Sequence, residues 1–249
     1  MPRCFVALGG NLGSVENTFG LARAELGRLA EVGPGRMSSV HRFGPVGQNA
    51  GGEFRNAAIE CETTLTPLDL LDRLQAIEDT LGRERSVRWG PRRLDLDLIF
   101  YGGQIIDCGR LSVPHPACWY RRFVLDPLAE IAADVVHPAK GVTVRELRER
   151  LRPRPLEIAL AGAENHRRTV LIDNLTANFP EVAFSHWDGT REQMGSLPAI
   201  IGWLGSAGSR LSEQAAWSSL PIVPRLDLTA GGEAAEKFVV DVLDSALGR

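Results

Sequence analysis

Two aspartates alternate with apolar residues near the middle of the chain. Residues 94–100 read Leu-Asp-Leu-Asp-Leu-Ile-Phe. Side chains alternate between the faces of a strand, so Asp95 and Asp97 would share one face and lie roughly 7 Å apart. A hard cation such as Mg²⁺ would relieve their repulsion and complete its coordination with phosphate oxygens and water. The alternative is an amphipathic strand whose acids simply face water, and the pair alone does not decide between the two.

An arginine-rich segment directly precedes this strand and contains Arg83, Arg85, Arg88, Arg92 and Arg93. Guanidinium groups bind phosphate oxygens through bidentate contacts, so arginines beside paired acids suit a metal–polyphosphate complex. A salt-bridged surface loop without a ligand is the alternative. The segment Trp89-Gly90-Pro91 favours a ligand, because an aromatic residue next to a flexible and a rigid one suits a loop that closes over a bound molecule.

The elements that would position these residues follow from periodicity and turn residues. Strands are expected at residues 4–8, 36–42, 54–65 and 94–101, and helices at residues 15–29 and 66–81. Thr66 and Pro67 suit the start of the second helix, and a capping box at Thr143 and Glu146 predicts another. Residues 107–123 are expected to be irregular. Because a glycine-rich loop joins the second and third strands, this part is expected to be α+β with a mainly antiparallel sheet.

A stiff connector, Arg152-Pro153-Arg154-Pro155, predicts a boundary between a domain of residues 1–152 and a smaller α/β domain of residues 156–249. In the second domain, strands are expected at 156–161, 182–186, 199–204 and 222–228, and a last helix at 233–247. Residues 162–169 have the layout of a phosphate-binding P-loop, but Arg167 stands at its second glycine and Arg168 at its lysine. A degenerate P-loop kinase-like remnant is one interpretation, and a strand followed by a charged loop is the other.

The composition of the 249 residues is that of an ordinary soluble globular protein, with 44% hydrophobic and 24% charged residues. A net charge of −3 gives no reason to expect nucleic acid or an anionic membrane as a partner. The four cysteines form no CxxC pair, so buried reduced thiols are expected. With no signal-like start and no long apolar run, the expected location is the cytoplasm. No pattern indicates an oligomeric state.

The segment from Arg88 to Ile99 resembles the signature of the 6-hydroxymethyl-7,8-dihydropterin pyrophosphokinase family. Four further segments resemble other parts of that family in the same order along the chain: residues 9–13, 54–58, 113–116 and 121–123. The resemblance covers about residues 3–151. It implies a ferredoxin-like sandwich of an antiparallel sheet with helices. It also implies transfer of pyrophosphate from ATP to the hydroxymethyl oxygen of the pterin, with release of AMP, in tetrahydrofolate biosynthesis.

The resemblance also implies which residues act. Two Mg²⁺ ions would be held by Asp95 and Asp97, and the catalytic set would be Arg83, Arg92, Asp95 and Asp97. ATP would be bound by Gln75, Glu78, Arg85, Arg88, Trp89, Leu98, Arg110, Ser112, His115 and Arg121. The pterin would be bound by Gly44, Val46, Phe54, Asn56 and Phe123, with the two phenylalanine rings on either side of it and the Asn56 amide at its edge.

The sequence departs from the family pattern at three positions: Phe43, where a small hydroxyl residue is usual, Gly44, where proline is common, and Pro116, where tyrosine is frequent. These departures indicate an altered pterin loop and an altered nucleotide contact. Two functions of other classes stay open at this point. One is a non-catalytic partner that keeps its ligand site by descent, and the other is nucleic-acid binding through the arginines. The presence of both aspartates disfavours the non-catalytic partner, and the negative net charge disfavours nucleic-acid binding.

Overall fold

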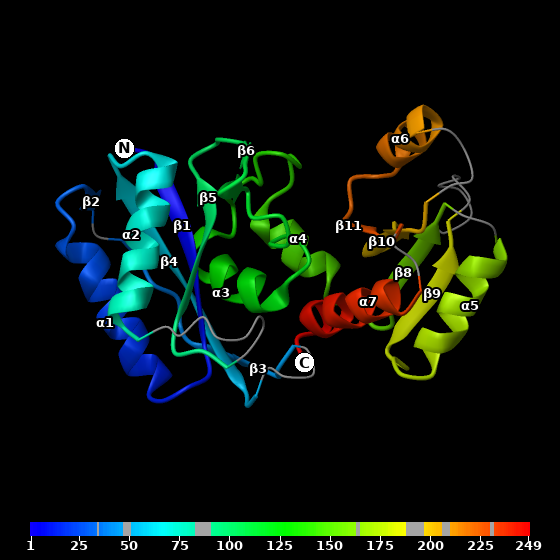
Figure 1. Cartoon of the computed structure of the whole chain (residues 1–249), viewed down its shortest axis with the longest axis horizontal. Helices are drawn as coiled ribbons and strands as arrows, with labels where there is room; N and C mark the ends of the chain where they lie inside the picture. Colours follow the sequence, from blue (N-terminus) through cyan, green and yellow to red (C-terminus); the bar gives the residue numbers. More distant parts are fainter. Residues whose placement is uncertain are drawn as a thin grey trace. The chain divides into compact units, whose positions relative to one another are not determined.

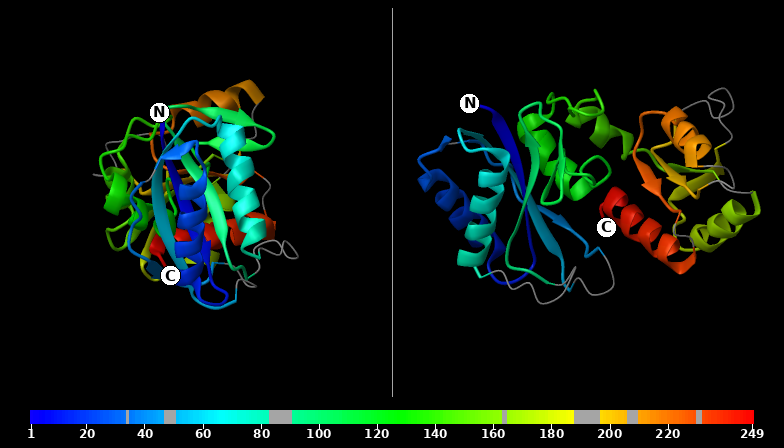
Figure 2. Two further views of the ribbon diagram at one scale, coloured as in Figure 1. Left: turned by 90° about the vertical axis from the view of Figure 1, so that its left-hand side faces the viewer. Right: turned by 45° about the horizontal axis from the view of Figure 1, so that its top comes forward.

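The computed structural model describes residues 1–33, 35–46, 51–82, 91–162, 165–187, 197–205, 210–229 and 232–249. Figures 1 and 2 show its helices and strands. The chain divides into two compact units, residues 1–148 with 248–249 and residues 149–247. No helix within the described ranges is both long enough and apolar enough to cross a membrane.

The first unit is built on an antiparallel sheet in which β1 (Arg3–Gly10) lies between β4 (Phe54–Thr63) and β5 (Asp95–Tyr101). The strand order is β2-β4-β1-β5, with β2 at Val32–Gly33, and β3 (His41–Phe43) also pairs with β4. The expected α+β class with an antiparallel sheet is therefore confirmed for this unit.

Helices α1 (Val15–Arg28) and α2 (Pro67–Thr80) cover one face of this sheet (Figure 1). The main core lies between them and the sheet and includes Phe19, Leu74, Leu8 and Leu96. Helices α3 (Arg122–Ala132) and α4 (Val144–Arg150) lie on the other side of the sheet (Figure 2). The strands are therefore buried on both faces, and one cavity lies at the end of the sheet beside β3.

Two segments of this unit differ in part from the expectation. Residues 114–121 lie outside helices and strands, as expected for residues 107–123, but β6 (Ile106–Cys108) and β7 (Leu111–Val113) form a hairpin before them, and α3 begins at Arg122. Strands of three residues are too short to show a period in the sequence, and α3 contains Pro127 and lacks a side-chain cap. Between residues 36 and 42 the continuous ladder is limited to β3, and Met37 forms a separate bridge with Ile59.

The cysteines are all free thiols, and Cys4, Cys61 and Cys118 are buried. Cys4 of β1 lies directly opposite Cys61 of β4 in the sheet register. Cys108 of β6 is exposed. The expectation of buried reduced thiols is therefore met at three of the four positions.

The second unit has a parallel sheet in the order β11-β10-β8-β9. Its strands are β8 (Leu156–Ala161), β9 (Val182–His186), β10 (Ile200–Trp203) and β11 (Arg225–Asp227), and its helices are α5 (Asn165–Thr176), α6 (Arg210–Ser219) and α7 (Gly232–Leu247). Arg168, at the position of a P-loop lysine, is buried, and its Nη1 donates to the carbonyl oxygens of Leu160 (3.3 Å) and Trp187 (3.1 Å).

Candidate active site

The paired acids are carried by β5, whose side chains alternate in burial as the sequence predicts. Asp95 and Asp97 are half-buried, while Leu96 and Leu98 are buried in the core. The core side chains on one face fix the register of the strand, because a slip by one residue would exchange its apolar and acidic faces. The two carboxylates are thereby directed to the opposite face.

The central strand β1 brings the acids close to the predicted pterin residues. Gly9 lies opposite Asp95 of β5 on one side and opposite Asn56 of β4 on the other. A Cβ atom at Gly9 would lie 3.2 Å from Asn56 Oδ1 and 3.9 Å from Asp95 Cβ. Glycine at this position leaves the space in which the amide and the carboxylate face one cavity.

This cavity contains all of the residues expected to bind the pterin and the metal. It is lined by Ala7, Leu8, Gly9, Phe43, Gly44, Val46, Phe54, Asn56, Arg92, Asp95, Asp97, Phe123 and Val124. All five predicted pterin residues are present, together with Arg92 and both aspartates. The cavity also has five lining residues that were not predicted from the sequence as site residues: Ala7, Leu8, Gly9, Phe43 and Val124. The glycine pair that ends β1 is the only signal in the sequence that could have indicated the β1 contribution.

Arg92 links the acidic strand to the aromatic part of the cavity. Its Nη1 donates to Asp95 Oδ2 at 2.7 Å, and its guanidinium lies 5.6 Å from the ring centre of Phe54. The turn after β1 positions it: the backbone N–H of Arg92 donates to Asn11 Oδ1 (2.9 Å), and the backbone N–H of Asn11 donates to the Arg92 carbonyl (2.9 Å). Arg92 Nε is buried and has no hydrogen-bond partner in the part of the chain that the structure describes. A buried N–H of this kind suits an anionic ligand.

The residues expected to bind ATP are more dispersed. Arg83, Arg85, Arg88 and Trp89 lie outside the described residues. Glu78 is buried and accepts a hydrogen bond from the backbone N–H of Leu96 (2.6 Å), and Leu98 is a core residue. In the hairpin region, Arg110 pairs with Asp72, and Ser112 donates to Asp107 (3.0 Å). Gln75 is half-buried on α2. Among the residues described, none of this set lines the cavity that holds the aspartates.

His115 and Arg121 both lie in the segment just before α3. The backbone N–H of His115 donates to the Ile99 carbonyl (3.1 Å), and its Nδ1 accepts from the backbone N–H of Ala117 (3.2 Å). Burial, assisted by the charge of Arg121 and opposed by Asp95, lowers the pKa of His115 to about 4. The imidazole is therefore neutral at neutral pH, with its proton on Nε2. The Arg121 guanidinium lies 5.4 Å from the ring centre of Phe123.

The donor set of the cavity fits Mg²⁺ better than a soft metal. No group of three or more histidine, cysteine or acidic side chains able to hold a metal occurs in the described ranges. Two carboxylates in one cavity are what Mg²⁺ takes from a protein when phosphate oxygens supply further ligands. Zinc sites, by contrast, use three or four protein ligands.

Comparison with known proteins decides the family. Residues 5–133 match the family described as 7,8-dihydro-6-hydroxymethylpterin-pyrophosphokinase (HPPK). The chain belongs to the HPPK family. The match contains every cavity residue named above, whereas the second unit lies beyond it.

Several similar proteins carry the corresponding name. The 2-amino-4-hydroxy-6-hydroxymethyldihydropteridine pyrophosphokinase of Synechocystis sp. is 45% identical over 149 residues, which are 59% of this chain and 74% of that protein. The enzyme of the same name from Bacillus subtilis is 44% identical over 131 residues, 53% of this chain and 78% of that protein. A crystal structure of wild-type Plasmodium falciparum HPPK-DHPS aligns with a TM-score of 0.45 and 11% identity, covering 88% of this chain and 59% of that one.

Proposed function

We propose that the cavity at the end of β1, β4 and β5 is the active site of the pyrophosphokinase reaction. The chain is an HPPK: it transfers pyrophosphate from ATP to 6-hydroxymethyl-7,8-dihydropterin, which gives AMP and the pterin diphosphate in tetrahydrofolate biosynthesis. The observation that carries the placement of the site is the shared cavity of the paired aspartates, Arg92 and the predicted pterin residues.

The pterin would bind between the rings of Phe54 and Phe123. Both rings line the cavity, and flat heterocycles bind well between aromatic faces. Asn56 is buried beside them, and its amide offers both a donor and an acceptor to the edge of the pterin. Gly44 and Val46 also line the cavity, and they would bind the pterin through their backbone groups.

The reacting phosphates would lie against the acidic strand. Asp95 and Asp97 would hold two Mg²⁺ ions, which supply charge neutralisation on the phosphates and activation of the pterin hydroxyl. Arg92 would neutralise phosphate oxygens with the N–H groups that Asp95 does not use, including the buried Nε. The protein then contributes mainly position and charge, as in other phosphoryl transfers.

The ATP residues are proposed from the family resemblance: Gln75, Glu78, Arg85, Arg88, Trp89, Leu98, Arg110, Ser112, His115 and Arg121, with Arg83 as a catalytic residue at the phosphates. The described geometry bears on two of these residues, His115 and Glu78. His115 is held as a neutral ring, which can donate one hydrogen bond. Glu78 is engaged with β5, so its contribution would be to hold that strand.

We also propose the finer description of the fold and the domains. The element order is β1-α1-β2-β3-β4-α2-β5, in which β3 is a short additional strand paired with β4. Without β3, this order and the strand order β2-β4-β1-β5 support a ferredoxin-like sandwich for residues 1–152. Residues 156–249 would be a small α/β domain, a degenerate remnant that no longer binds phosphate. The engagement of Arg168 with two carbonyl groups supports this, because the guanidinium is not directed to a phosphate. The partners would be small molecules, without nucleic acid or membrane, in the cytoplasm.

The decisive experiment measures AMP release from ATP with and without 6-hydroxymethyl-7,8-dihydropterin, in the wild type and in Asp97→Ala. Wild type should release AMP only with the pterin. Asp97→Ala should lower the rate at least about a thousandfold, because loss of a metal ligand removes several kcal/mol of charge stabilisation. Asp79→Ala, which removes an exposed carboxylate from α2, is the matched control and should keep the wild-type rate. An Asp97→Ala protein that is folded and fully active would contradict the placement of the site.

A further inference from the structure

The short strand β3 is aligned with the pterin strand β4, residue by residue. Phe43 lies directly opposite Phe54, and His41 lies directly opposite Asn56. Directly opposed residues of an antiparallel pair have Cβ atoms about 5 Å apart on the same face of the sheet. The two residues that would bind the pterin on β4 therefore each have a ring beside them on β3.

Phe43 belongs to the cavity itself. It lines the cavity together with Phe54 and Phe123. Its ring meets the ring of Phe123 edge-on, with 6.3 Å between the centres and 69° between the planes. On its other side, Phe43 is stacked with His41, at 6.3 Å and 16°. If Phe54 and Phe123 form the faces of a slot, Phe43 forms a wall across its side.

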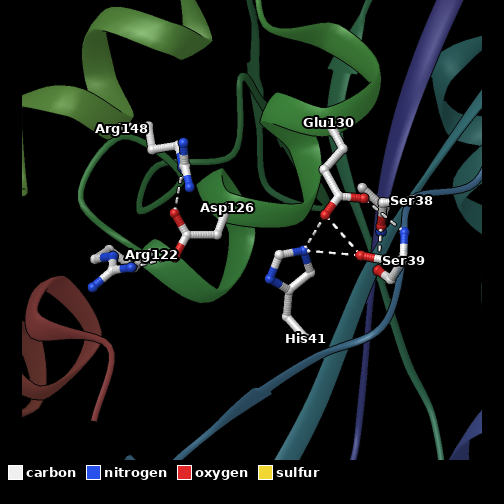
Figure 3. Close-up of polar contacts among 8 residues, drawn as sticks. Ser38, Ser39, His41, Arg122, Asp126, Glu130 and Arg148 are labelled. Atoms are coloured by element: carbon white, nitrogen blue, oxygen red, sulfur yellow. Dashed lines mark hydrogen bonds and ion pairs between the residues drawn. The ribbon is translucent and has the colours of Figure 1, made fainter.

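A polar cluster from α3 fixes the strand that carries Phe43. Figure 3 shows Glu130 of α3 directed to Ser39 and His41. Glu130 Oε1 accepts from Ser39 Oγ (2.7 Å) and lies 2.7 Å from His41 Nε2, and Glu130 Oε2 accepts from the backbone N–H of Ser39 (2.8 Å). Burial alone would raise the pKa of Glu130, but the hydrogen bonds from Ser39 and His41 outweigh it and lower that pKa.

The helix that carries Glu130 is itself held. Asp126, one turn earlier on α3, is buried and accepts from Arg122 Nη2 (2.7 Å) and from Arg148 Nε of α4 (2.6 Å) (Figure 3). Phe123 is on the same helix. One rigid helix therefore carries both a face of the slot and the carboxylate that fixes its side wall.

We propose that Phe43 is a third aromatic wall of the pterin pocket and that Glu130 is a positioning residue, which holds Phe43 in place through Ser39 and His41. This inference rests on the proposed function, because it concerns how the same site recognises the flat pterin ring. A small residue at position 43 would leave the side of the slot open. The phenylalanine closes it with an apolar edge and confines the pterin between Phe54 and Phe123.

The test is a double-mutant cycle on steady-state kinetics, with Phe43→Leu, Glu130→Ala and the double variant in the full chain. Phe43→Leu keeps apolar volume and removes the ring, so the KM for the pterin should rise roughly tenfold. Glu130→Ala should raise it about threefold. In both single variants, Phe43→Leu and Glu130→Ala, the KM for ATP should stay at the wild-type value. The kcat should change less than the KM for the pterin. In the Phe43→Leu background, Glu130→Ala should add no further effect.

Three controls make the outcome decisive. Asp134→Ala removes an exposed carboxylate that pairs with Arg145 just after α3, and it should leave both KM values unchanged. Glu130→Gln, which retains an acceptor for Ser39, should recover part of the wild-type KM. Thermal melting shows that each variant is folded. An unchanged KM for the pterin in Phe43→Leu, or a Glu130→Ala effect of the same size in both backgrounds, overturns the inference. If wild type releases no AMP with the pterin, the proposed function fails instead.

Discussion

Gly9 of β1 lies between Asp95 of β5 and Asn56 of β4, where the acidic side of the cavity meets the side proposed to bind the pterin. A Cβ atom there would lie 3.2 Å from Asn56 Oδ1, which is closer than most real contacts. Gly9→Ala should therefore displace the Asn56 amide and raise the KM for the pterin several-fold, roughly the loss of one hydrogen bond of about 1 kcal/mol. Steady-state AMP release measures this effect.

The matched control for Gly9 is Gly20, in helix α1. A Cβ atom at Gly20 would meet nothing within 4 Å. Gly20→Ala should raise the free energy of unfolding by about 0.5–1 kcal/mol and leave the kinetics unchanged, because alanine restricts the unfolded chain and suits a helix. A Gly9→Ala enzyme with the wild-type KM for the pterin would show that the amide does not contact the substrate.

His137 should make the free energy of unfolding of the first unit depend on pH. Its ring packs 5.5 Å from Phe100 and 6.3 Å from Trp119, and burial, together with Lys140, lowers its pKa from 6.5 to about 4. The unfolded chain therefore binds a proton between pH 6.5 and 4 that the folded chain does not. The contribution of His137 to the free energy of unfolding is fully present above pH 6.5. It should decrease by up to about 3 kcal/mol as the pH falls to 4.

Urea denaturation at several pH values tests this expectation. His137→Phe keeps a buried ring that cannot titrate, so its unfolding free energy should fall less steeply between pH 6.5 and 4. In His137→Phe, the unfolding free energy should still depend on pH, because burial also lowers the pKa of His115 to about 4. An identical slope in His137→Phe and wild type would contradict the assignment.

Helix α2 depends on its first turn to place Glu78 and hold β5. Thr66 Oγ1 accepts from the backbone N–H of Asp69 (3.3 Å) and donates to its carboxylate (2.6 Å). Thr66→Ala should lower the free energy of unfolding by about 1 kcal/mol, the usual value of an N-cap. Chemical denaturation followed by circular dichroism measures it. Thr64→Ala, at an exposed position just before the helix, should change it by less than about 0.5 kcal/mol.

Elements with a strong local period were predictable from the sequence, and those defined by distant contacts were not. The alternation in β5 and the cap of α2 are local, so the residues alone indicate them. Helix α3 lacks a side-chain cap and contains a proline, and packing against β4 and β3 specifies it instead. The site shows the same division: Asp95 and Asp97 are apparent as a pair, but Glu130 and His41 are 89 residues apart and their contact depends on the tertiary fold.

The two units have separate cores and different sheets, one antiparallel and one parallel. All the residues that line the cavity proposed as the active site belong to the first unit, which is also where the family match lies. The spacing of Gly162 and Thr169 indicates the layout of a P-loop, and Arg167 and Arg168 indicate a degenerate one. The direction of the Arg168 side chain cannot be read from the sequence, because it donates to the carbonyl groups of Leu160 in β8 and of Trp187, the residue after β9.

The distribution of the thiols through the whole chain has a practical consequence. Burial raises the pKa of Cys4 to about 12, of Cys61 to about 11 and of Cys118 to about 12. Cys4 and Cys61 lie opposite each other, within the usual reach of a disulfide, but oxidation proceeds through the thiolate and these thiols stay protonated at neutral pH. A maleimide or Ellman's reagent should therefore titrate one thiol in the native protein and four in denaturant. The native signal should vanish in Cys108→Ser; more than one reactive thiol in the native wild type would contradict the burial of the others. A single fluorophore can thus be attached to β6 of the wild-type chain without removing any other cysteine.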